Sequence, residues 1–392
     1  GSDVLDGGAG FDTLTVYDDA NVDNLTKASI SNIEKVVAVG SSHAINLSAN
    51  ADVREVWVKN GTSAITATKA QIAGYEGTTT AASITFTDAS GTADAATVAL
   101  NGVTGTSVTV TSAAPANEIE AQTLKLAGKN VLTGFTNAKM TSLTITGDGS
   151  LAGAADAAAV VTAGAGLLKS VDASAATGDL TLSFTQANLN TTEFAYTGSN
   201  GADKIDFDAA LTQKVTIDLG TGDDTLTLVG APTGKGSTFN GGEGNDTLVF
   251  DFAMTAEQGK LFTGFENLKL AGTTASYEVG QIAGITSYEV AATTAATITK
   301  LADGATVTAS GNAMAAVTLN LADPSAATSA LNITLDNGAK AVADGVDLTT
   351  LSTNAHVLNI ASKGMVNADA NGVILSGDSL ANFTNVHISA DQ

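Results

Sequence analysis

The sequence predicts a mostly β fold, a parallel β-roll or β-solenoid with few short helices. Short alternating runs of Thr, Val, Ile and Ala are separated by turns, with 41 Gly but only 3 Pro in 392 residues. Such runs are typical of strands joined by tight turns. Aromatic residues make up only 5% of the chain, so the side chains bury little area each and the interior should be thin and repetitive. Glycine–aspartate turns also recur along the chain.

The charge and the cysteine content limit which partners and which kinds of metal site this chain can have. The net charge is −23, from 40 acidic and 17 basic residues. Such a charge argues against nucleic acid or anionic lipid as a binding partner and favours cations as ligands. The absence of cysteine excludes disulfides and thiolate metal sites, and a bound metal is an alternative staple. No apolar run is long enough to span a bilayer. No signal peptide is visible at Gly1, and we expect a fragment or a processed product.

Two nonapeptides match the calcium-binding β-roll pattern G-G-x-G-x-D-x-U-x completely, where U is a large apolar residue. Glycines allow positive φ and leave carbonyls bare, and aspartate supplies the hard oxygen that Ca²⁺ prefers. One turn cannot provide the roughly six to eight oxygens of a calcium shell, so the ion should lie between successive turns. The full copies are GGAGFDTLT (7–15) and GGEGNDTLV (241–249); looser copies are GSNGADKID (198–206) and LGTGDDTLT (219–227), with a half copy, GSDVLD, at 1–6.

The predicted calcium ligands are the aspartates of these turns, with turn carbonyls and neighbouring polar groups. The three later copies start at 198, 219 and 241, about one full coil apart. Asp203, Asp224 and Asp246 should therefore form a column, and Asp3 and Asp12 a separate pair. The alternative is that these are ordinary turns of an acidic β protein. The predicted metal set is Asp3, Asp12, Asp203, Asp223, Asp224, Asp246, Gly7, Gly198, Gly220, Gly241, Asn200 and Asn245.

A second pattern reads apolar, any, small, apolar, then Glu or Thr. We interpret it as one rung of a β-solenoid with an inward apolar pair. The sequence gives no support for a functional role of Glu34, Glu266 or Glu289. Brief helices are expected over 21–29 and 254–262. The pattern occurs as ISNIEKV (30–36), LTGFTNA (132–138), FTGFENL (262–268), ITSYEVA (285–291) and LANFTNV (380–386).

The order of these features predicts four segments. Residues 1–150 form a turn plus a β-solenoid unit, and residues 151–196 a connecting β and Ala/Gly-rich segment whose first part could be a linker or a short helix. Residues 197–252 form a calcium-binding β-roll segment. Residues 253–392 form a second β-solenoid unit.

The full nonapeptides, the Ala/Thr/Val-rich repeats, the acidity and the lack of cysteine resemble RTX-type surface-layer (S-layer) proteins of Gram-negative bacteria. The resemblance implies type I secretion, calcium-triggered folding outside the cell, and self-association into a two-dimensional lattice on the cell surface. In this family a separate N-terminal region anchors the lattice to lipopolysaccharide. This chain has no obvious counterpart, so any such attachment would be indirect, through a region outside it.

The sequence contains no motif of an enzyme in a fitting context. H-E-x-x-H, G-x-S-x-G, the P-loop and the dinucleotide fingerprint are absent. GDSL (377–380), with Ser379 and the later His387, lacks the α/β context of the hydrolases that share these letters. We therefore expect a non-enzyme. Two alternatives to the lattice protein stay open: an RTX adhesin or spacer fragment that presents a binding domain, and the non-catalytic C-terminal part of an RTX enzyme.

Overall fold

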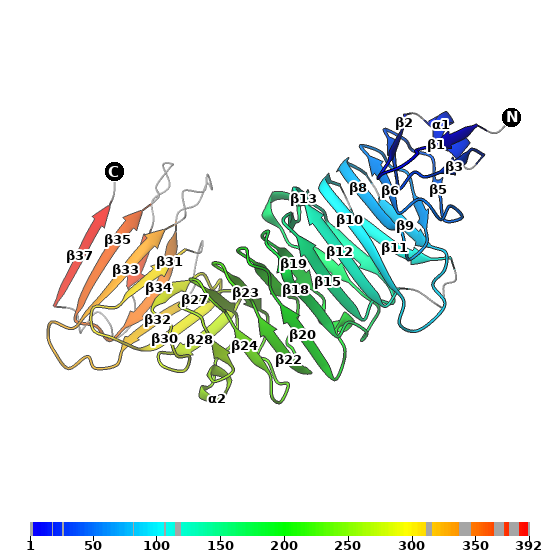
Figure 1. The fold of residues 1–392 in the computed structure, drawn as a ribbon. Coiled ribbons are helices and arrows are strands. Elements are labelled where there is room, and N and C mark those ends of the chain that lie inside the picture. Colours follow the sequence, from blue (N-terminus) through cyan, green and yellow to red (C-terminus); the bar gives the residue numbers. More distant parts are fainter. Residues whose placement is uncertain are drawn as a thin grey trace. The chain divides into compact units, whose positions relative to one another are not determined.

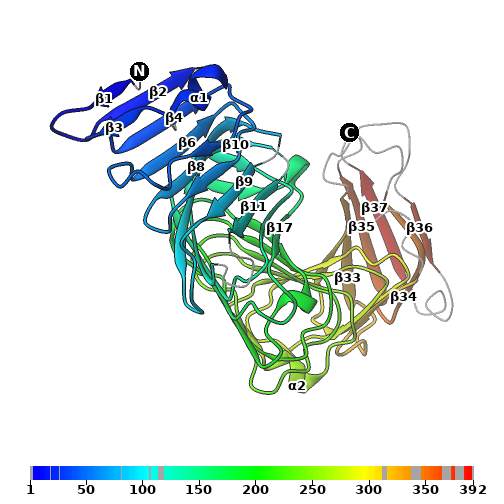
Figure 2. The same cartoon turned by 90° about the vertical axis from the view of Figure 1, so that its right-hand side faces the viewer.

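The fold is described from a computed structural model, which covers residues 3–17, 19–25, 27–80, 82–105, 107–113, 119–310, 316–336, 346–363, 372–375 and 384–390. Within these ranges the chain is a β-solenoid of parallel strands with two short α-helices (Figures 1 and 2). This confirms the predicted fold class. The chain divides into two compact units, Gly1–Asp208 with Thr212–Gly222, and Ala209–Leu211 with Asp223–Gln392. The division falls inside the segment predicted as a β-roll.

The first unit winds between two parallel sheets, and from β4 onward its coils alternate between them. One sheet has the order β2 (Thr13–Tyr17), β4 (Lys35–Val39), β6 (Glu55–Lys59), β8 (Ile72–Thr78), β10 (Ala95–Thr104), β12 (Ala121–Ala127), β15 (Ser142–Gly147), β18 (Ser170–Ala176), β20 (Glu193–Thr197) and β22 (Lys214–Asp218). The other has the order β5 (Ile45–Asn46), β7 (Ile65–Ala67), β9 (Ala82–Phe86), β11 (Ser107–Ser112), β14 (Gly134–Asn137), β17 (Ala159–Thr162), β19 (Thr181–Phe184) and β21 (Lys204–Phe207). Smaller pairings join β1 (Val4–Asp6) to β3 (Ser29–Ser31), and β13 (Lys129–Val131) to β10 and β16 (Ser150–Ala152).

The second unit repeats this winding with its own strands. One series runs β23 (Thr225–Leu228), β25 (Thr247–Phe250), β27 (Asn267–Leu270), β29 (Ser287–Val290), β31 (Thr306–Ala309), β33 (Ala330–Asp336), β35 (Val357–Lys363) and β37 (Asn385–Ala390). A second series runs β28 (Thr274–Glu278), β30 (Ala295–Leu301), β32 (Ala316–Leu321), β34 (Asp347–Thr353) and β36 (Gly372–Leu375), and β24 (Thr238–Asn240) pairs with β26 (Phe262–Thr263).

The core lies between the facing sheets and is one side chain deep on each strand. Strand β6 is an example, because Val56 and Val58 are buried while their neighbours are partly exposed. Parallel pairing in register places like residues above one another, as with Val36 and Val56. The apolar positions of the first three copies of the rung pattern are buried as expected, including Ile30, Ile33 and Val36 of the first copy and Phe262, Phe265 and Leu268 of the third. In the fourth copy Ile285 is partly exposed, and the apolar pair of the fifth, Leu380 and Phe383, lies outside the described residues.

The short helices and the Ala/Gly-rich stretch fit into this winding. Helix α1 (Asp19–Leu25) and helix α2 (Ala256–Gly259) confirm the two predicted brief helices. In α2 the Thr255 hydroxyl accepts a hydrogen bond from the Gln258 amide, and the Gln258 side chain accepts one from the Thr255 amide, a capping box. The 151–166 stretch contains the 3₁₀ helix η1 (Ala154–Asp156) and strand β17, so it forms part of a coil. A second 3₁₀ helix, η2, spans Gln186–Asn188. No helix in the described ranges has the length and apolar character of a membrane span.

Candidate metal-binding turns

The glycine–aspartate turns share one backbone conformation in three of the four copies. Two glycines spaced two residues apart adopt positive φ in each, which residues with a side chain rarely do. In the 198–203 copy neither Gly198 nor Gly201 does so. The three pairs are Gly8 (87°) with Gly10 (129°), Gly220 (99°) with Gly222 (127°), and Gly242 (108°) with Gly244 (144°).

Other glycines of these turns let successive coils approach backbone to backbone. A Cβ on Gly241 would lie 1.9 Å from the carbonyl oxygen of Gly264 and 2.8 Å from Oδ2 of Asp246. A Cβ on Gly7 would lie 2.0 Å from the carbonyl oxygen of Asn32. The carboxylate of each full repeat therefore lies in a cradle that only glycine keeps open. A Cβ on Gly198 would lie 1.9 Å from the Leu219 carbonyl oxygen, and one on Gly220 would lie 2.3 Å from the Ser199 carbonyl oxygen.

In both full repeats the aspartate is joined to a glutamate one coil later, an arrangement that we call an Asp–Glu corner. The Asp12 amide donates to Oε2 of Glu34 at 2.8 Å, and the Glu34 amide donates to the Asp12 carbonyl at 3.2 Å. Asp246 and Glu266 make the same two bonds at 2.8 and 3.1 Å. The sequence showed these glutamates in the rung pattern that follows each full repeat, but gave no sign of their partners.

Asp246 is a buried carboxylate with an unused oxygen. Its Oδ1 accepts a hydrogen bond from the Asp224 amide at 2.8 Å. Its Oδ2 is buried and has no hydrogen-bond partner among the described residues. Burial raises the pKa of Asp246, and the nearby charges of Glu266 and Asp223 raise it further, against the lowering effect of the Asp224 amide. The charged form of this carboxylate is therefore disfavoured unless a cation lies beside it.

Asp12 repeats the feature that matters for metal binding. Its Oδ2 is also buried without a hydrogen-bond partner in the described part of the chain. None of the ion pairs found within the described ranges involves Asp12 or Asp246. The orphaned carboxylate oxygens and the glycine cradles fit a hard divalent cation.

Three more predicted ligands gather around Asp246 in the second unit. Asp224 is buried, and its carbonyl accepts a hydrogen bond from the Thr247 amide at 2.8 Å. Asp223 is exposed, and its Oδ1 accepts a hydrogen bond from the Asn245 amide at 3.0 Å. The Asn245 carbonyl is approached by the Asn267 side chain at 3.5 Å. Asp223, Asp224, Asn245 and Asp246 therefore belong to stacked turns.

Asp203 has a different environment from Asp12 and Asp246. Its Oδ1 accepts hydrogen bonds from the Ser199 hydroxyl (2.7 Å) and the Leu180 amide (2.9 Å), and its Oδ2 from the Ser199 amide (2.8 Å) and the Tyr196 hydroxyl (3.3 Å). Burial raises its pKa to about 6, although these bonds oppose the shift. Both oxygens accept hydrogen bonds from protein donors, which a cation would have to displace in order to bind Asp203. The Asn200 amide donates a hydrogen bond to the Ala176 carbonyl, and the Asn200 carbonyl accepts one from the Thr221 hydroxyl.

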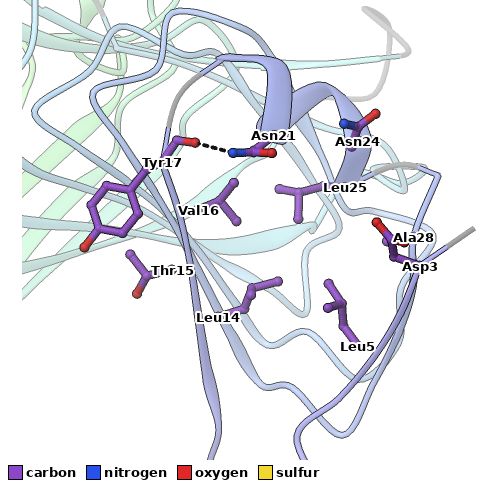
Figure 3. Close-up of a pocket in the computed structure, with 10 residues that line it drawn as sticks. All are labelled: Asp3, Leu5, Leu14, Thr15, Val16, Tyr17, Asn21, Asn24, Leu25 and Ala28. Atoms are coloured by element: carbon purple, nitrogen blue, oxygen red, sulfur yellow. Dashed lines mark hydrogen bonds between the residues drawn. The ribbon is translucent and has the colours of Figure 1, made fainter.

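Asp3 lies on the wall of a pocket of about 280 Å³ beneath helix α1 (Figure 3). Leu5, Leu14 and Leu25 line the same pocket. The Asp3 carbonyl accepts a hydrogen bond from the Ser29 amide at 2.8 Å. These surroundings are mostly apolar, so they do not supply the oxygen ligands that a calcium ion at Asp3 would need.

The described residues contain no cluster of three or more His, Cys, Asp or Glu side chains that could hold a metal. Ser379 lies outside the described residues, while His387 is on β37. The His356 ring lies 3.1 Å from the Ser329 hydroxyl. No protein-family model matches the chain, and no curated protein matches it.

Proposed function

We propose that this chain is a secreted structural protein of the bacterial cell surface, not an enzyme, that folds on Ca²⁺ and assembles laterally into an S-layer lattice. The observation that carries the proposal is the Asp246 corner. A fully buried carboxylate lies there beside the charges of Glu266 and Asp223, with one oxygen lacking a partner in the described part of the chain. The resemblance to RTX surface-layer proteins supplies the cell-surface setting.

The mechanism is linkage between ion binding and folding. Burying a carboxylate without an opposite charge beside it costs several kcal/mol, and neighbouring carboxylates add repulsion. An ion held between stacked turns removes both effects, and that arrangement is lost when the coils separate. A ligand that binds only the folded state stabilises it by about 2.7 kcal/mol when its concentration is 100 times its Kd. The Asp12 corner offers a second position of the same kind.

Two features support self-association. Among the described residues, β2 is the outermost strand of one sheet and β37 the outermost strand of another, and outermost strands are where a sheet can pair with a further chain. Exposed large apolar side chains gather near these edges. Of the seven within the described ranges, five lie close to them: Val4, Phe11, Tyr17, Val386 and Ile388.

The proposal is tested on the purified chain in millimolar Ca²⁺, in Mg²⁺ at equal concentration, and in EGTA. Circular dichroism should show that Ca²⁺ raises the unfolding temperature more than Mg²⁺, because Mg²⁺ demands a smaller octahedral shell. Electron microscopy should show ordered sheets that dissolve in EGTA. Calcium-induced folding with monomeric particles would leave the metal sites and favour the adhesin or spacer. No response to calcium would refute the proposal.

A further inference from the structure

The first unit contains a third Asp–Glu corner, at a turn outside the nonapeptide pattern. The Asp94 amide donates to Oε2 of Glu120 at 2.8 Å, and the Glu120 amide donates to the Asp94 carbonyl at 3.1 Å. In all three corners the glutamate carbonyl then accepts two amides of the next coil. These amides belong to Arg54 and Glu55 for Glu34, to Thr141 and Ser142 for Glu120, and to Thr286 and Ser287 for Glu266.

The third corner differs from the other two in that it contains an ammonium group and leaves neither oxygen of its aspartate without a partner. Nζ of Lys69, from the preceding coil, forms an ion pair and hydrogen bond with Oδ1 of Asp94. Oδ2 of Asp94 accepts hydrogen bonds from the amides of Ser90 (2.7 Å) and Gly91 (2.8 Å). The pair is shielded from water, since the Lys69 and Asp94 side chains are only 26% and 10% exposed.

We infer that the Asp94–Glu120 corner is a divalent-cation site of the same kind, filled by the chain's own Lys69 ammonium. A bound calcium ion and the Lys69 side chain would be alternatives at this corner. The inference rests on the proposed function, in which calcium occupies the Asp12 and Asp246 corners. It goes further, because it assigns a third site and a reason why that site needs no metal.

The charges around Lys69 support this assignment. Its pKa is raised first by the hydrogen bond to Asp94, against burial, and then by the charges of Asp94, Asp88 and Glu120. The pKa of Asp94 is lowered, first by Lys69 and then by the Gly91 amide. The charges of three carboxylates thus act on one ammonium group, which contacts Asp94 directly. Removal of the ammonium group would leave the carboxylates of this corner without a neighbouring positive charge, as Asp246 is in its own corner.

The test compares Lys69→Met with the wild-type chain and with Lys300→Met. Methionine keeps the length of the side chain and removes its charge. Lys300 pairs with Glu278 on the surface, where the two side chains are 61% and 44% exposed, so Lys300→Met makes the same charge change without opening a corner. Calcium binding is counted by isothermal titration calorimetry, and thermal unfolding is followed in EGTA and in Ca²⁺.

Lys69→Met should bind one more calcium ion than the wild-type chain. It should unfold at a lower temperature than the wild type in EGTA and recover in Ca²⁺, whereas Lys300→Met should match the wild type in both measurements. An unchanged ion count would overturn the inference. Failure of Lys69→Met to fold in either buffer would also overturn it, because calcium would then be unable to replace the ammonium group.

The double variant Lys69→Met/Asp94→Asn removes both charges. It should fold in EGTA and lose the additional calcium ion; if it keeps that ion, the new site lies elsewhere and the inference fails. The outcome is separable from that of the proposed function. A wild-type chain that binds no calcium would refute the proposed function, while the difference between Lys69→Met and wild type would still decide this inference.

Discussion

Asp246→Asn separates the cost of the buried charge from the role in calcium binding that we propose for it. Asparagine can still accept the Asp224 amide through its side-chain oxygen, at the distance of 2.8 Å found for Asp246. It also removes the repulsion from Glu266 and Asp223 that raises the pKa of Asp246. In EGTA we therefore expect the variant and the wild type to be equally stable to within about 1 kcal/mol, the size of one net hydrogen bond.

In calcium the variant should lose the stabilisation of one site. This loss is about 2.7 kcal/mol at a calcium concentration of 100 times Kd. For a unit of this size it corresponds to an unfolding temperature lower by roughly 5 to 10 °C. Differential scanning calorimetry in both buffers measures the two differences. Asp148→Asn, at an exposed turn, is the matched control and should change neither.

The reasoning is refuted if Asp246→Asn lowers the unfolding temperature equally in EGTA and in calcium. Such a result would mean that Asp246 acts through its protein hydrogen bonds alone, as Asp203 does.

Three further predictions concern neighbouring residues. The pKa of Asp203 rises from 3.8 to about 6 on folding, so the folded state binds the extra proton between these values and stability should fall by up to about 3 kcal/mol as pH rises from about 4 to 6. Urea unfolding in EGTA should show a steeper fall of stability over this pH range in the wild type than in Asp203→Asn, whose remaining fall comes from groups such as Asp246. Gly241→Ala should destabilise by about 1–3 kcal/mol, because its Cβ would meet the Gly264 carbonyl at 1.9 Å; Gly91→Ala, with no atom nearer than 3.8 Å, should be neutral in thermal unfolding. Glu266→Gln keeps an acceptor for the Asp246 amide and should weaken calcium affinity without changing stability in EGTA. Glu266→Ala should lower both the calcium affinity and the stability in EGTA. Calorimetric titration measures the affinity of each variant, and thermal unfolding measures its stability.

The fold class could be predicted because it depends on local patterns. Alternating small apolar residues specify strands, and the rung pattern places Ile30, Ile33 and Val36 inward. The partners across coils could not be predicted, because the number of residues per coil varies. The carboxylate of Glu34 is 22 residues from Asp12, and that of Glu120 is 26 residues from Asp94.

The role of Asp203 shows a second limit of motif reasoning. Its turn keeps the aspartate but has Ser199 where the full repeats have the glycines Gly8 and Gly242. The Ser199 hydroxyl and amide both donate to Asp203, so one side chain in place of a glycine changes which donors surround the carboxylate. Conversely, Asp94 forms an Asp–Glu corner with only one glycine in its turn, Gly91. The backbone bonds between coils define this corner more closely than the nonapeptide does.

Because calcium is proposed for two of the three corners and the third contains the Lys69 ammonium group, chelation should loosen them unequally. In each corner the aspartate amide is bonded to a glutamate carboxylate, and hydrogen exchange reports the opening of that bond directly. In EGTA the amides of Asp12 and Asp246 should exchange faster than in calcium, since repulsion between unshielded carboxylates favours opening. The Asp94 amide should keep its protection in both buffers, because the Lys69 ammonium stays in place. Equal loss of protection at all three amides would contradict this reasoning, and so would the absence of any change at Asp246.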